Sequence, residues 1–589
     1  MLCLVVPSWL ITVDGFVGAC LTPLAIAILI SGLDDLVVDL VWLWGRFRRR
    51  AARLPQPAPT NEKRIAILVP LWHEHAVIER MLDHNLAAIH YRNYDFFVGG
   101  YPNDDPTLDA IRQVEARSSR VHLAVCPHDG PTSKADCLNW IYQRMLLHEE
   151  RHGCHFDAIV THDAEDMIHP ESLAVMNREL ESFDMVQVPV LPLPTPPLEM
   201  VHGVYIDEFA EFQMKDMLVR RWMGSFTPSS GVGTAYSRRA LEKLADAAEN
   251  RIFEPVCLTE DYENGMRLHM LGCRSVFVPL EARAQETVAT REYFPRTLRA
   301  AIRQRTRWVT GIALQSWERH GWKGSAGQKY WFWRDRKGLL GNPLSLAANL
   351  MFLYGLATFW WLPATHSLDR RLAAATFVLL LYRTAIRASC VGRLYGIAFA
   401  LSVPIRCVYA NFINSVASIR ATYRFARARI LSQPLVWLKT EHKYPSRGTL
   451  LAHKRKLGEL LTASGYITPS ELGAALAAKP PHLRLGEFLV TRGMLTEEQL
   501  YRELSLQHGL PVGSIRPEDI SANAARALPR NIMRSSRVLP FRIASGSLHL
   551  ATPDVPTDEL ASELRGFTNL DIRFQLVTTK NFESLLHLL

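Results

Sequence analysis

Positive charge is missing from the start of this chain, and paired-cysteine and phosphate-loop motifs are missing from all of it. The nine cysteines are dispersed, with no Cys-x-x-Cys pair, which argues against a zinc site or disulfide framework and favours domains in a reducing compartment. No Gly-x4-Gly-Lys-Ser/Thr loop occurs, so a P-loop ATPase is not expected. The first 45 residues contain no Lys or Arg, whereas a signal peptide begins with positive charge.

Over the whole chain, basic residues outnumber acidic ones, with 67 Lys and Arg against 58 Asp and Glu and a net charge of +9. This balance suits either nucleic acid or an anionic membrane surface. The arginines cluster beside apolar segments, as membrane anchoring predicts, so we expect a membrane and no nucleic acid as a partner. The length of 589 residues predicts several domains.

Residues 1–53 are expected to form an N-terminal transmembrane anchor with its basic flank. The segment 16–44 is apolar and long enough to cross a bilayer, and RFRRRAAR (46–53) follows with five arginines. This order predicts an outside N-terminus and a cytosolic continuation. Asp34, Asp35 and Asp39 are expensive inside a bilayer, so they must lie near the inner interface or face other helices.

Residues 64–335 alternate strand-like and helix-like segments after a linker at 54–60. The strand-like runs are IAILVPLW, DFFVGGY, VHLAVC, DAIVTHD and MVQVPVL. This pattern predicts an α/β domain with buried, mostly parallel strands.

Residues 343–430 form a second apolar block. NPLSLAANLMFLYGLATFWWLP (342–363) and residues 372–390 are long enough to span a membrane. Residues 394–425 are interrupted by Pro404 and Arg406. If the arginines after the first span and the basic run after residue 419 both lie in the cytosol, the number of spans between them must be even. We therefore predict that residues 394–425 form helices at the membrane interface. A re-entrant or fourth spanning helix is the alternative.

Residues 450–589 are expected to form a soluble α+β domain that contains an internal repeat. Residues 456–479 and 484–507 share eight identities in 24 positions at an offset of 28. Each copy has a capping-box pattern, Thr468 with Glu471 and Thr496 with Gln499, which predicts a helix start in each.

Three carboxylates, Asp163, Glu165 and Asp166, crowd the end of an apolar run in THDAEDMIHP (161–170). An ordinary solvated turn would also fit this stretch. Ligands of open α/β sheets bind at the carboxyl ends of strands, however, and an acid-x-acid pair there can hold a hard divalent cation. We therefore expect Asp163 and Glu165 to be ligands of Mg²⁺ or Mn²⁺ that bridges a diphosphate.

Other segments supply candidate contacts for a nucleotide sugar, although each of them alone would also fit an ordinary surface. They follow strands, begin a helix or lie in a glycine-rich turn. The candidates are Glu74 in VPLWHEH (69–75), Asn103, Asp104 and Asp105 in GYPNDDPT (100–107), Lys134 in GPTSKADCLNW (130–140), Asp163, and Gly231 in PSSGVGTAYSRRAL (228–241).

Two further motifs are candidates for the chemistry. Thr259 can cap a helix whose first turn holds Glu260 and Asp261, where the helix dipole favours ionised carboxylates that can accept a proton from a sugar hydroxyl. An ordinary acidic first turn is the alternative. RQRTRW (303–308) offers side chains for a leaving diphosphate and an indole for stacking on a sugar, namely Gln304, Arg305, Arg307 and Trp308.

In their order along the chain, these motifs resemble the membrane-embedded family-two glycosyltransferases related to cellulose and hyaluronan synthases. The matching elements are the acids near 103–105, DAE at 163–165, TED at 259–261 and QRTRW at 304–308. The resemblance implies a Rossmann-like nucleotide-diphospho-sugar transferase fold of the GT-A type, a UDP-sugar donor, a glycan acceptor, a divalent metal, and inverting transfer with Asp261 as the base. Asp163-x-Glu165 stands where the family usually has Asp-x-Asp.

Over its whole length the chain resembles the NfrB type of inner-membrane protein, known as a subunit of a phage-adsorption system. The segments ISGLDD, YPND, GPTSKADCLN, HDAED, WRDRKG and RLG carry this resemblance. It implies a bacterial inner-membrane, multi-pass protein with cytosolic catalytic and C-terminal domains, and a partner in the outer membrane or periplasm.

The C-terminal domain resembles MshEN domains, many of which bind cyclic di-GMP. Their motif begins Arg-Leu-Gly, ends in Gln and has leucines between that contact the ligand. The second copy matches this motif, and the first departs from it at both ends, with Lys456 and Lys479. The resemblance implies a regulatory cyclic di-GMP site at Lys456, Leu457, Gly458, Leu461, Arg484, Leu485, Gly486, Leu489 and Gln507.

Together these features predict an inner-membrane, metal-dependent inverting glycosyltransferase that transfers or polymerises sugar into an envelope or secreted glycan under cyclic di-GMP control. The rival hypothesis is a non-catalytic membrane receptor or scaffold that uses a degenerate transferase fold.

Overall fold

The structure of the protein is a computed structural model that describes most of the chain. It covers residues 8–50, 61–248, 250–280, 287–358, 370–433, 456–463, 466–481, 483–508, 510–544, 547–568 and 570–587. The linker expected at 54–60 lies outside these residues. The chain divides into two compact units, Met1–Met81 with Tyr91–Tyr444, and Leu82–His90 with Pro445–Leu589.

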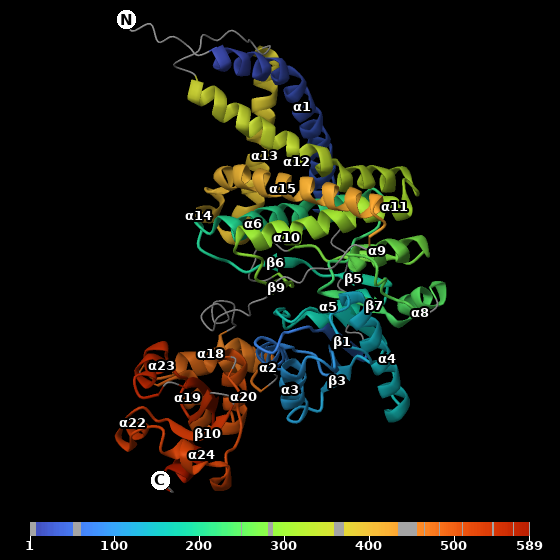
Figure 1. Cartoon of the computed structure of the whole chain (residues 1–589). Coiled ribbons are helices and arrows are strands. Elements are labelled where there is room, and N and C mark those ends of the chain that lie inside the picture. The colour runs from blue at the N-terminus through green and yellow to red at the C-terminus, as the bar shows by residue number, and fades with distance from the viewer. Residues whose placement is uncertain are drawn as a thin grey trace, which may run out of the picture. The chain divides into compact units, whose positions relative to one another are not determined.

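A seven-stranded sheet in the order β3-β2-β1-β4-β7-β5-β8 forms the centre of the first unit (Figure 1). Its strands are β1 (Ile65–Pro70), β2 (Tyr94–Gly100), β3 (Val121–Val125), β4 (Ala158–Thr161), β5 (Met185–Gln187), β7 (Thr234–Ser237) and β8 (Ser275–Phe277). All pairs are parallel except those of β7, which runs antiparallel to β4 and β5. Strands β1, β2 and β4 are almost wholly buried, because helices cover them and leave no polar face.

The predicted run MVQVPVL divides into two strands, β5 and β6 (Val190–Pro192). Strand β6 leaves the main sheet and pairs in parallel with β9 (Thr290–Glu292). This small second sheet brings residue 292 close to the carboxyl end of β4, because Met167 bridges to Arg291. The mostly parallel α/β prediction is confirmed.

Helices follow most strands of the first unit, and α3 and α4 pack on the β1–β3 side of the sheet. The helices are α3 (Asp105–Glu115), α4 (Lys134–His152), α5 (Ser172–Glu179), α6 (Met200–Glu211), α7 (Met217–Trp222), α8 (Arg238–Ala247), α9 (Glu260–Met270), α10 (Leu298–Trp308) and α11 (Ser316–His320). Helix α2 (Ile78–Ala88) is divided between the two units after Met81. The π-helical turns η1 (Phe212–Asp216) and η2 (Val309–Gln315) join α6 to α7 and α10 to α11.

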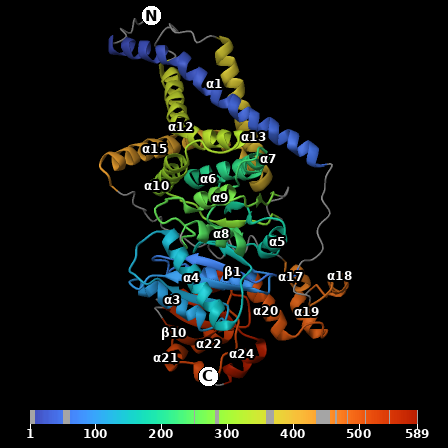
Figure 2. The ribbon, with the colours of Figure 1, turned by 90° about the vertical axis from the view of Figure 1, so that its right-hand side faces the viewer.

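Three helices are long and apolar enough to cross a membrane, namely α1 (Ser8–Arg50), α12 (Ala326–Thr358) and α13 (Arg370–Tyr395). They are the only such helices in the described part of the chain and correspond to the three spans expected from the sequence. Helix α12 begins well before residue 343, so the boundary expected between 335 and 343 falls inside one continuous helix. Helix α6 lies between these helices and the sheet in both views (Figure 2).

The acidic residues of α1 face other helices. Asp34 accepts hydrogen bonds from Arg334 and Lys337 of α12, each at 2.7 Å. Asp39 is fully buried between Lys215 of η1, at 2.5 Å, and Arg383 of α13, at 3.0 Å. Each carboxylate is therefore neutralised by a cation from another helix, as a charge inside or beside a membrane must be.

Helices α14 (Ile397–Ala400) and α15 (Val403–Ile430) follow the three apolar helices. Helix α15 packs against α12, α10 and α6. The two interruptions in the sequence explain this position. Pro404 lies in the first turn of α15, where a proline is tolerated, and Arg406 is buried on Asp207 of α6, to which it donates at 2.7 and 2.8 Å.

The second unit has a helical part followed by a small α/β part. The repeat folds as α17 (Leu457–Ala463) with α18 (Pro469–Ala478), and α19 (Leu485–Thr491) with α20 (Glu497–His508). Strands β10 (Leu539–Ala544), β11 (Ser547–Thr552) and β12 (Asp571–Leu576) form a sheet in which β10 and β11 are antiparallel and β11 and β12 parallel. The remaining elements are η3 (Pro517–Asp519), α21 (Ala522–Ala525), α22 (Arg530–Ser535), α23 (Asp558–Arg565) and α24 (Thr579–Leu586).

The two copies of the repeat use equivalent contacts. Both predicted capping boxes form, at Thr468 with Glu471 and at Thr496 with Gln499. Gly458 of the first copy lies against Leu472, and Gly486 of the second lies against Leu500. Both pairs are related by the offset of 28 seen in the sequence, so the repeat is structural as well as sequential.

Candidate active site

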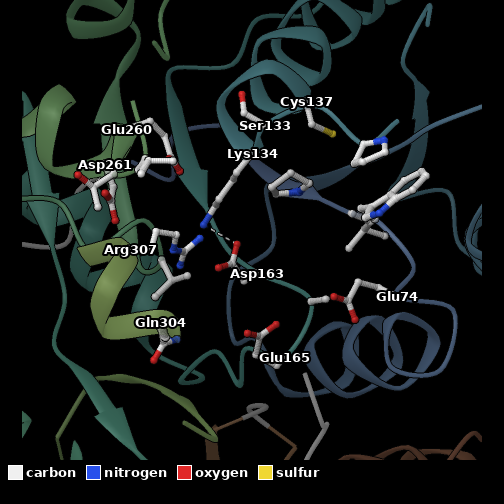
Figure 3. A pocket seen from close by; sticks show the side chains of 18 of the residues that line it. Glu74, Ser133, Lys134, Cys137, Asp163, Glu165, Glu260, Asp261, Gln304 and Arg307 are labelled. Atoms are coloured by element: carbon white, nitrogen blue, oxygen red, sulfur yellow. Dashed lines mark ion pairs between the residues drawn. The ribbon is translucent and has the colours of Figure 1, made fainter. Parts of the chain in front are cut away.

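An open cleft of about 1060 Å³ lies at the carboxyl ends of β1 and β4 in the first unit. Nine of the predicted site residues line it, namely Glu74, Lys134, Asp163, Glu165, Glu260, Asp261, Gln304, Arg307 and Trp308. Figure 3 shows these side chains coming from different elements toward one space. Acidic motifs that are far apart in the sequence therefore meet around a single cleft.

Lys134 is the central cation of this cleft. It is the first residue of α4, whose N-cap Ser133 accepts a hydrogen bond from the backbone N–H of Asp136. Its ammonium lies 2.6 Å from Oδ1 of Asp163 (Figure 3). Burial opposes the charged form of Lys134, but Asp163, Glu260 and Asp261 outweigh it and raise the pKa above its usual value.

The crowded carboxylates after β4 have different roles. Asp166 is fully buried, with Oδ2 2.7 Å from Nδ1 of His162 and accepting from the backbone N–H of Asp163 at 2.9 Å. It closes the turn and does not line the cleft. Asp163 and Glu165 do line it, so the turn held by Asp166 presents two of the three carboxylates to a ligand.

Glu260 and Asp261 begin α9 and face the cleft beside Lys134 (Figure 3). Burial and the neighbouring Asp261 raise the pKa of Glu260 to about 7, and burial also raises the pKa of Asp261. Burial thus favours the protonated carboxyl groups, whereas the helix dipole was expected to favour the ionised ones. Thr259 occupies the N-cap position, but its side chain makes no capping hydrogen bond, so the predicted cap is wrong. Burial and mutual repulsion therefore favour the protonated form of Glu260 more than in a surface glutamate.

Gly231 lies directly beside these groups. Its φ is +77°, and a Cβ at this position would lie 2.9 Å from Oδ2 of Asp261 and 3.2 Å from Nζ of Lys134. Its carbonyl oxygen accepts from Lys134 at 3.3 Å. Only glycine fits both this backbone conformation and this space.

Helix α10 contributes one face to the cleft. Gln304 and Arg307 (Figure 3) line it together with Trp308. Oε1 of Gln304 and Nε of Arg307 are buried with no hydrogen-bond partner among the described residues. Arg305 lies outside the cleft, because its guanidinium donates to Glu208 at 2.5 Å and to Asn414 at 2.6 Å. The structure therefore does not bring Arg305 together with the other three residues.

The three polar residues after β2, Asn103, Asp104 and Asp105, do not line the cleft. Asn103 exchanges two hydrogen bonds with the backbone of Gly130, at 2.7 and 2.8 Å. Asp104 is buried and accepts from the backbone N–H of His73 at 2.6 Å. Asp105 is exposed in the first turn of α3. Asn103 and Asp104 thus hold the two segments that carry Trp72, Glu74 and Pro131 to the cleft wall.

Glu292 also lines the cleft, although no sequence pattern marks it as a site residue. Burial, together with the neighbouring carboxylates of Asp166 and Asp163, raises its pKa well above the usual value. A lone acid in the three-residue strand β9 has no motif of its own. Only the bridge between Met167 and Arg291 places it here.

A divalent cation fits the charge of this cleft. Six carboxyl groups line it, against the two cations Lys134 and Arg307, so an incoming diphosphate would meet strong repulsion without further positive charge. The described residues contain no group of three or more His, Cys, Asp or Glu side chains arranged to hold a metal. Mg²⁺ commonly binds through one or two carboxylates together with substrate phosphates, and Asp163 and Glu165 are suited to this.

The residues expected to bind cyclic di-GMP fall into two groups in the second unit. Gly458, Leu461, Gly486 and Leu489 are buried, and the two leucines belong to the core between the repeat helices. Lys456 and Arg484 are exposed, whereas Leu457, Leu485 and Gln507 are half-buried. The side chains that a ligand could contact are therefore those at the start of each copy and at the end of the second.

Two family models and several solved structures match parts of this chain. The family model "Glycosyltransferase like family 2" matches residues 62–311, and the MshEN domain model matches residues 508–589, after the repeat. A solved mannosyltransferase from Pyrobaculum calidifontis, in complex with GDP-Man and Mn²⁺, is 18% identical with a TM-score of 0.45 and covers 69% of this chain and 99% of its own. A structure of MshE with cdg is 29% identical with a TM-score of 0.21 and covers 23% and 98%.

The mixed α/β sheet, the cleft at its strand ends and the family matches define a glycosyltransferase family 2 domain joined to an MshEN domain. Bacteriophage adsorption protein B of Escherichia coli K12 is 34% identical over 567 residues, which is 90% of this chain and 76% of that protein. The chain belongs to the family of this protein.

Proposed function

We propose that the protein is a membrane-bound, metal-dependent inverting glycosyltransferase that takes sugar from a UDP-sugar and adds it to an envelope or secreted glycan. The observation that carries this proposal is the meeting of Asp163, Lys134 and Asp261 in one cleft with Gln304 and Arg307. The cleft offers a base, the two cations Lys134 and Arg307 for phosphate, and polar atoms with no hydrogen-bond partner among the described residues. These are the groups that glycosyl transfer from a diphosphate requires.

In the proposed reaction, an acceptor hydroxyl oxygen forms a bond to the anomeric carbon of the donor while the bond from that carbon to the diphosphate oxygen breaks. Asp261 accepts the hydroxyl proton, and its raised pKa makes it a stronger base than a surface aspartate. Lys134 and Arg307 stabilise the charge that develops on the leaving UDP. Trp308 offers an indole face to a sugar ring.

A divalent ion would be held by Asp163 and Glu165 together with the diphosphate oxygens. When bound, such an ion supplies positive charge to the leaving group. Asp163 would then exchange part of its contact with Lys134 for the metal. Lys134 can remain in place, because Glu260 and Asp261 also favour its charged form.

We place the catalytic unit at the cytosolic face of the bacterial inner membrane. The support is the run of arginines that follows the apolar part of α1, since cytosolic flanks are rich in Lys and Arg. Kinship with bacteriophage adsorption protein B suggests that the glycan, or the protein with an outer-membrane or periplasmic partner, also contributes to phage adsorption.

The test is transfer of label from UDP-sugars by the detergent-purified full-length protein with Mg²⁺ or Mn²⁺. Asp261→Asn removes the base and should abolish product, whereas the matched control Asp109→Asn, in an exposed acid of α3, should retain it. Product from Asp261→Asn at the level of the control would refute the mechanism. If Asp261→Asn also kept phage adsorption intact in cells, the receptor or scaffold function would be favoured instead.

We further propose that the second unit binds cyclic di-GMP and regulates the transferase. The support is the Arg-Leu-Gly start of the second copy, with Arg484 exposed beside the buried Gly486. Calorimetry on the full-length protein should show binding that is lost in Arg484→Ala and kept in the control Arg516→Ala, another exposed arginine of this unit. Unchanged affinity in Arg484→Ala would remove this assignment.

A further inference from the structure

Arg336 of α12 is a buried cation that forms no hydrogen bond or ion pair with any residue the structure describes. Its side chain is part of WRDRKG (333–338), a motif that the cleft does not use. Only 4% of the residue is exposed, and Nε, Nη1 and Nη2 are all buried with no hydrogen-bond partner among the residues that the structure describes. An unpaired buried charge is costly and is rarely kept without a function.

The other charged residues of this motif are all paired. Arg334 and Lys337 bind the aspartates of α1, and Asp335 accepts two hydrogen bonds from Arg220 at 2.9 Å each. The absence of a partner is thus particular to Arg336. Asp335, the adjacent carboxylate, attracts the charge of Arg336 through space, but its oxygens accept hydrogen bonds from Arg220 and Tyr262 and none from Arg336.

Aromatic rings surround the Arg336 guanidinium. Its central carbon lies 4.5 Å from the ring centroid of Trp322, 4.6 Å from that of Phe332 and 5.3 Å from that of Trp317. Rings stabilise the positive charge through their faces but accept none of the five N–H groups, which point outward in the guanidinium plane. The cage therefore holds the cation and leaves its donors for another group.

The outer wall of the cage faces away from the protein. Trp317 and Trp322 are each 42% exposed and contact each other edge to face at 5.8 Å. Exposed tryptophans beside an apolar helix are typical of the lipid headgroup region.

The position of Arg336 along α12 also fits the lipid headgroup region. From Arg336 to Thr358, the last described residue of the helix, α12 rises by about 33 Å at 1.5 Å per residue. The hydrocarbon core of a bilayer is about 30 Å thick. If α12 spans the membrane as proposed, Arg336 lies where the phosphates of the cytosolic leaflet lie.

We infer that Arg336 and its cage of Trp317, Trp322 and Phe332 form a binding site for a phosphate oxyanion, carried by the headgroup of an anionic phospholipid. The planar guanidinium can donate two parallel hydrogen bonds to one phosphate. This inference rests on the proposed membrane placement, but not on transferase activity.

The test measures the thermal unfolding midpoint of full-length protein purified in lipid-free detergent, with and without added phosphatidylglycerol. The lipid should raise the midpoint of the wild type and leave Arg336→Met unchanged, while Arg424→Met, which removes an exposed arginine of α15, should respond like the wild type. Without lipid, Arg336→Met should be at least as stable as the wild type, because a hydrophobic side chain replaces an uncompensated charge. An equal response of wild type and Arg336→Met would overturn the site.

A second arm identifies the source of the phosphate. Inorganic phosphate at the same concentration should not reproduce the effect, and an equal shift with it would overturn the lipid part of the inference.

Should Arg336→Met fail to fold, Arg336→Lys provides a second variant, because it keeps the charge and loses the planar guanidinium. Native mass spectrometry should then show phosphatidylglycerol binding about tenfold weaker than in the wild type, and undiminished binding would refute the role of the guanidinium. Neither measurement depends on sugar transfer. Failure to bind lipid would therefore leave the proposed transferase activity unaffected, and failure of sugar transfer would leave the lipid site unaffected.

Discussion

The hydroxyl of Tyr262 donates a hydrogen bond to Oδ2 of Asp335 at 2.6 Å. Tyr262 follows the proposed base Asp261 in α9, and Asp335 belongs to α12, one of the helices long and apolar enough to span a membrane. Asp335 also pairs with Arg220, which is 1% exposed. The first turn of α9 is therefore fixed to α12 through one carboxylate.

We predict that Asp335→Asn destabilises the first unit and lowers transfer. Removing the carboxylate leaves Arg220 buried and unpaired, a change that typically costs about 3–5 kcal/mol. Tyr262→Phe removes a single hydrogen bond to a charged group and should cost about 1.5–3 kcal/mol. Thermal unfolding in detergent would measure both. Equal midpoints for Asp335→Asn and wild type would contradict the anchoring role.

The pH dependence of transfer should reflect the pair Glu260 and Asp261. Since burial raises the pKa of Glu260 to about 7, protons leave the pair as the pH rises through neutrality, and kcat/KM should rise between about pH 6 and 8. In Glu260→Gln this rising limb should move to lower pH, because a neutral amide replaces a titrating neighbour. A pH profile of each variant checks this, and an unmoved limb in Glu260→Gln would exclude the pair as its origin.

The same shift predicts how stability depends on pH. The pKa of Glu260 is raised in the folded protein above its usual 4.5, so the folded state binds the proton more tightly than the unfolded chain does. Its contribution to stability is complete below about pH 4.5 and is lost as the pH rises through about 7. Glu260→Gln, which cannot ionise, should lose less stability than the wild type between pH 5 and 8 in a series of unfolding measurements.

The parts of the site that depend on local pattern could be predicted from the sequence. Asp163 and Asp261 each stand at a strand end or helix start that the apolar pattern marks, and both reach the cleft. The spacing of residues along α10 also predicts which members of the motif share one helix face. Gln304, Arg307 and Trp308 are spaced i, i+3 and i+4 and share a face, whereas Arg305 points elsewhere and binds Glu208.

The remaining features depend on contacts between distant segments. Glu292 reaches the cleft because β9 bridges to Met167 after β4 and pairs with β6, and the three-residue strand β9 has no pattern that stands out in the sequence. The aspartates of α1 could be placed at the interface or against other helices, and only the packing of α12 and α13 decides this, by supplying Arg334 and Arg383. Tertiary pairings of this kind have no local signature.

Gly231 offers a test of the crowding around the base. Gly231→Ala introduces a Cβ at a φ of +77° and 2.9 Å from Asp261, so it should both strain the backbone and displace the carboxylate. Gly224→Ala is the matched control, because its φ is +76° and a Cβ there meets nothing within 4 Å. Both should lose about 1–2 kcal/mol of stability from the backbone. Only Gly231→Ala should lower kcat strongly, and similar kcat values for both variants would contradict a close contact with Asp261.

The repeat of the second unit provides the last prediction. A Cβ on Gly486 would lie 2.4 Å from Leu500, which is buried, whereas a Cβ on Gly473 within α18 meets nothing within 4 Å. Gly486→Ala should therefore cost about 1–3 kcal/mol through overpacking, while Gly473→Ala should stabilise its helix by up to about 1 kcal/mol. Hydrogen exchange of the repeat helices in the full-length protein would separate the two effects. Faster exchange in α19 and α20 is expected for Gly486→Ala alone, and unchanged exchange there would show that Leu500 does not pack against this glycine.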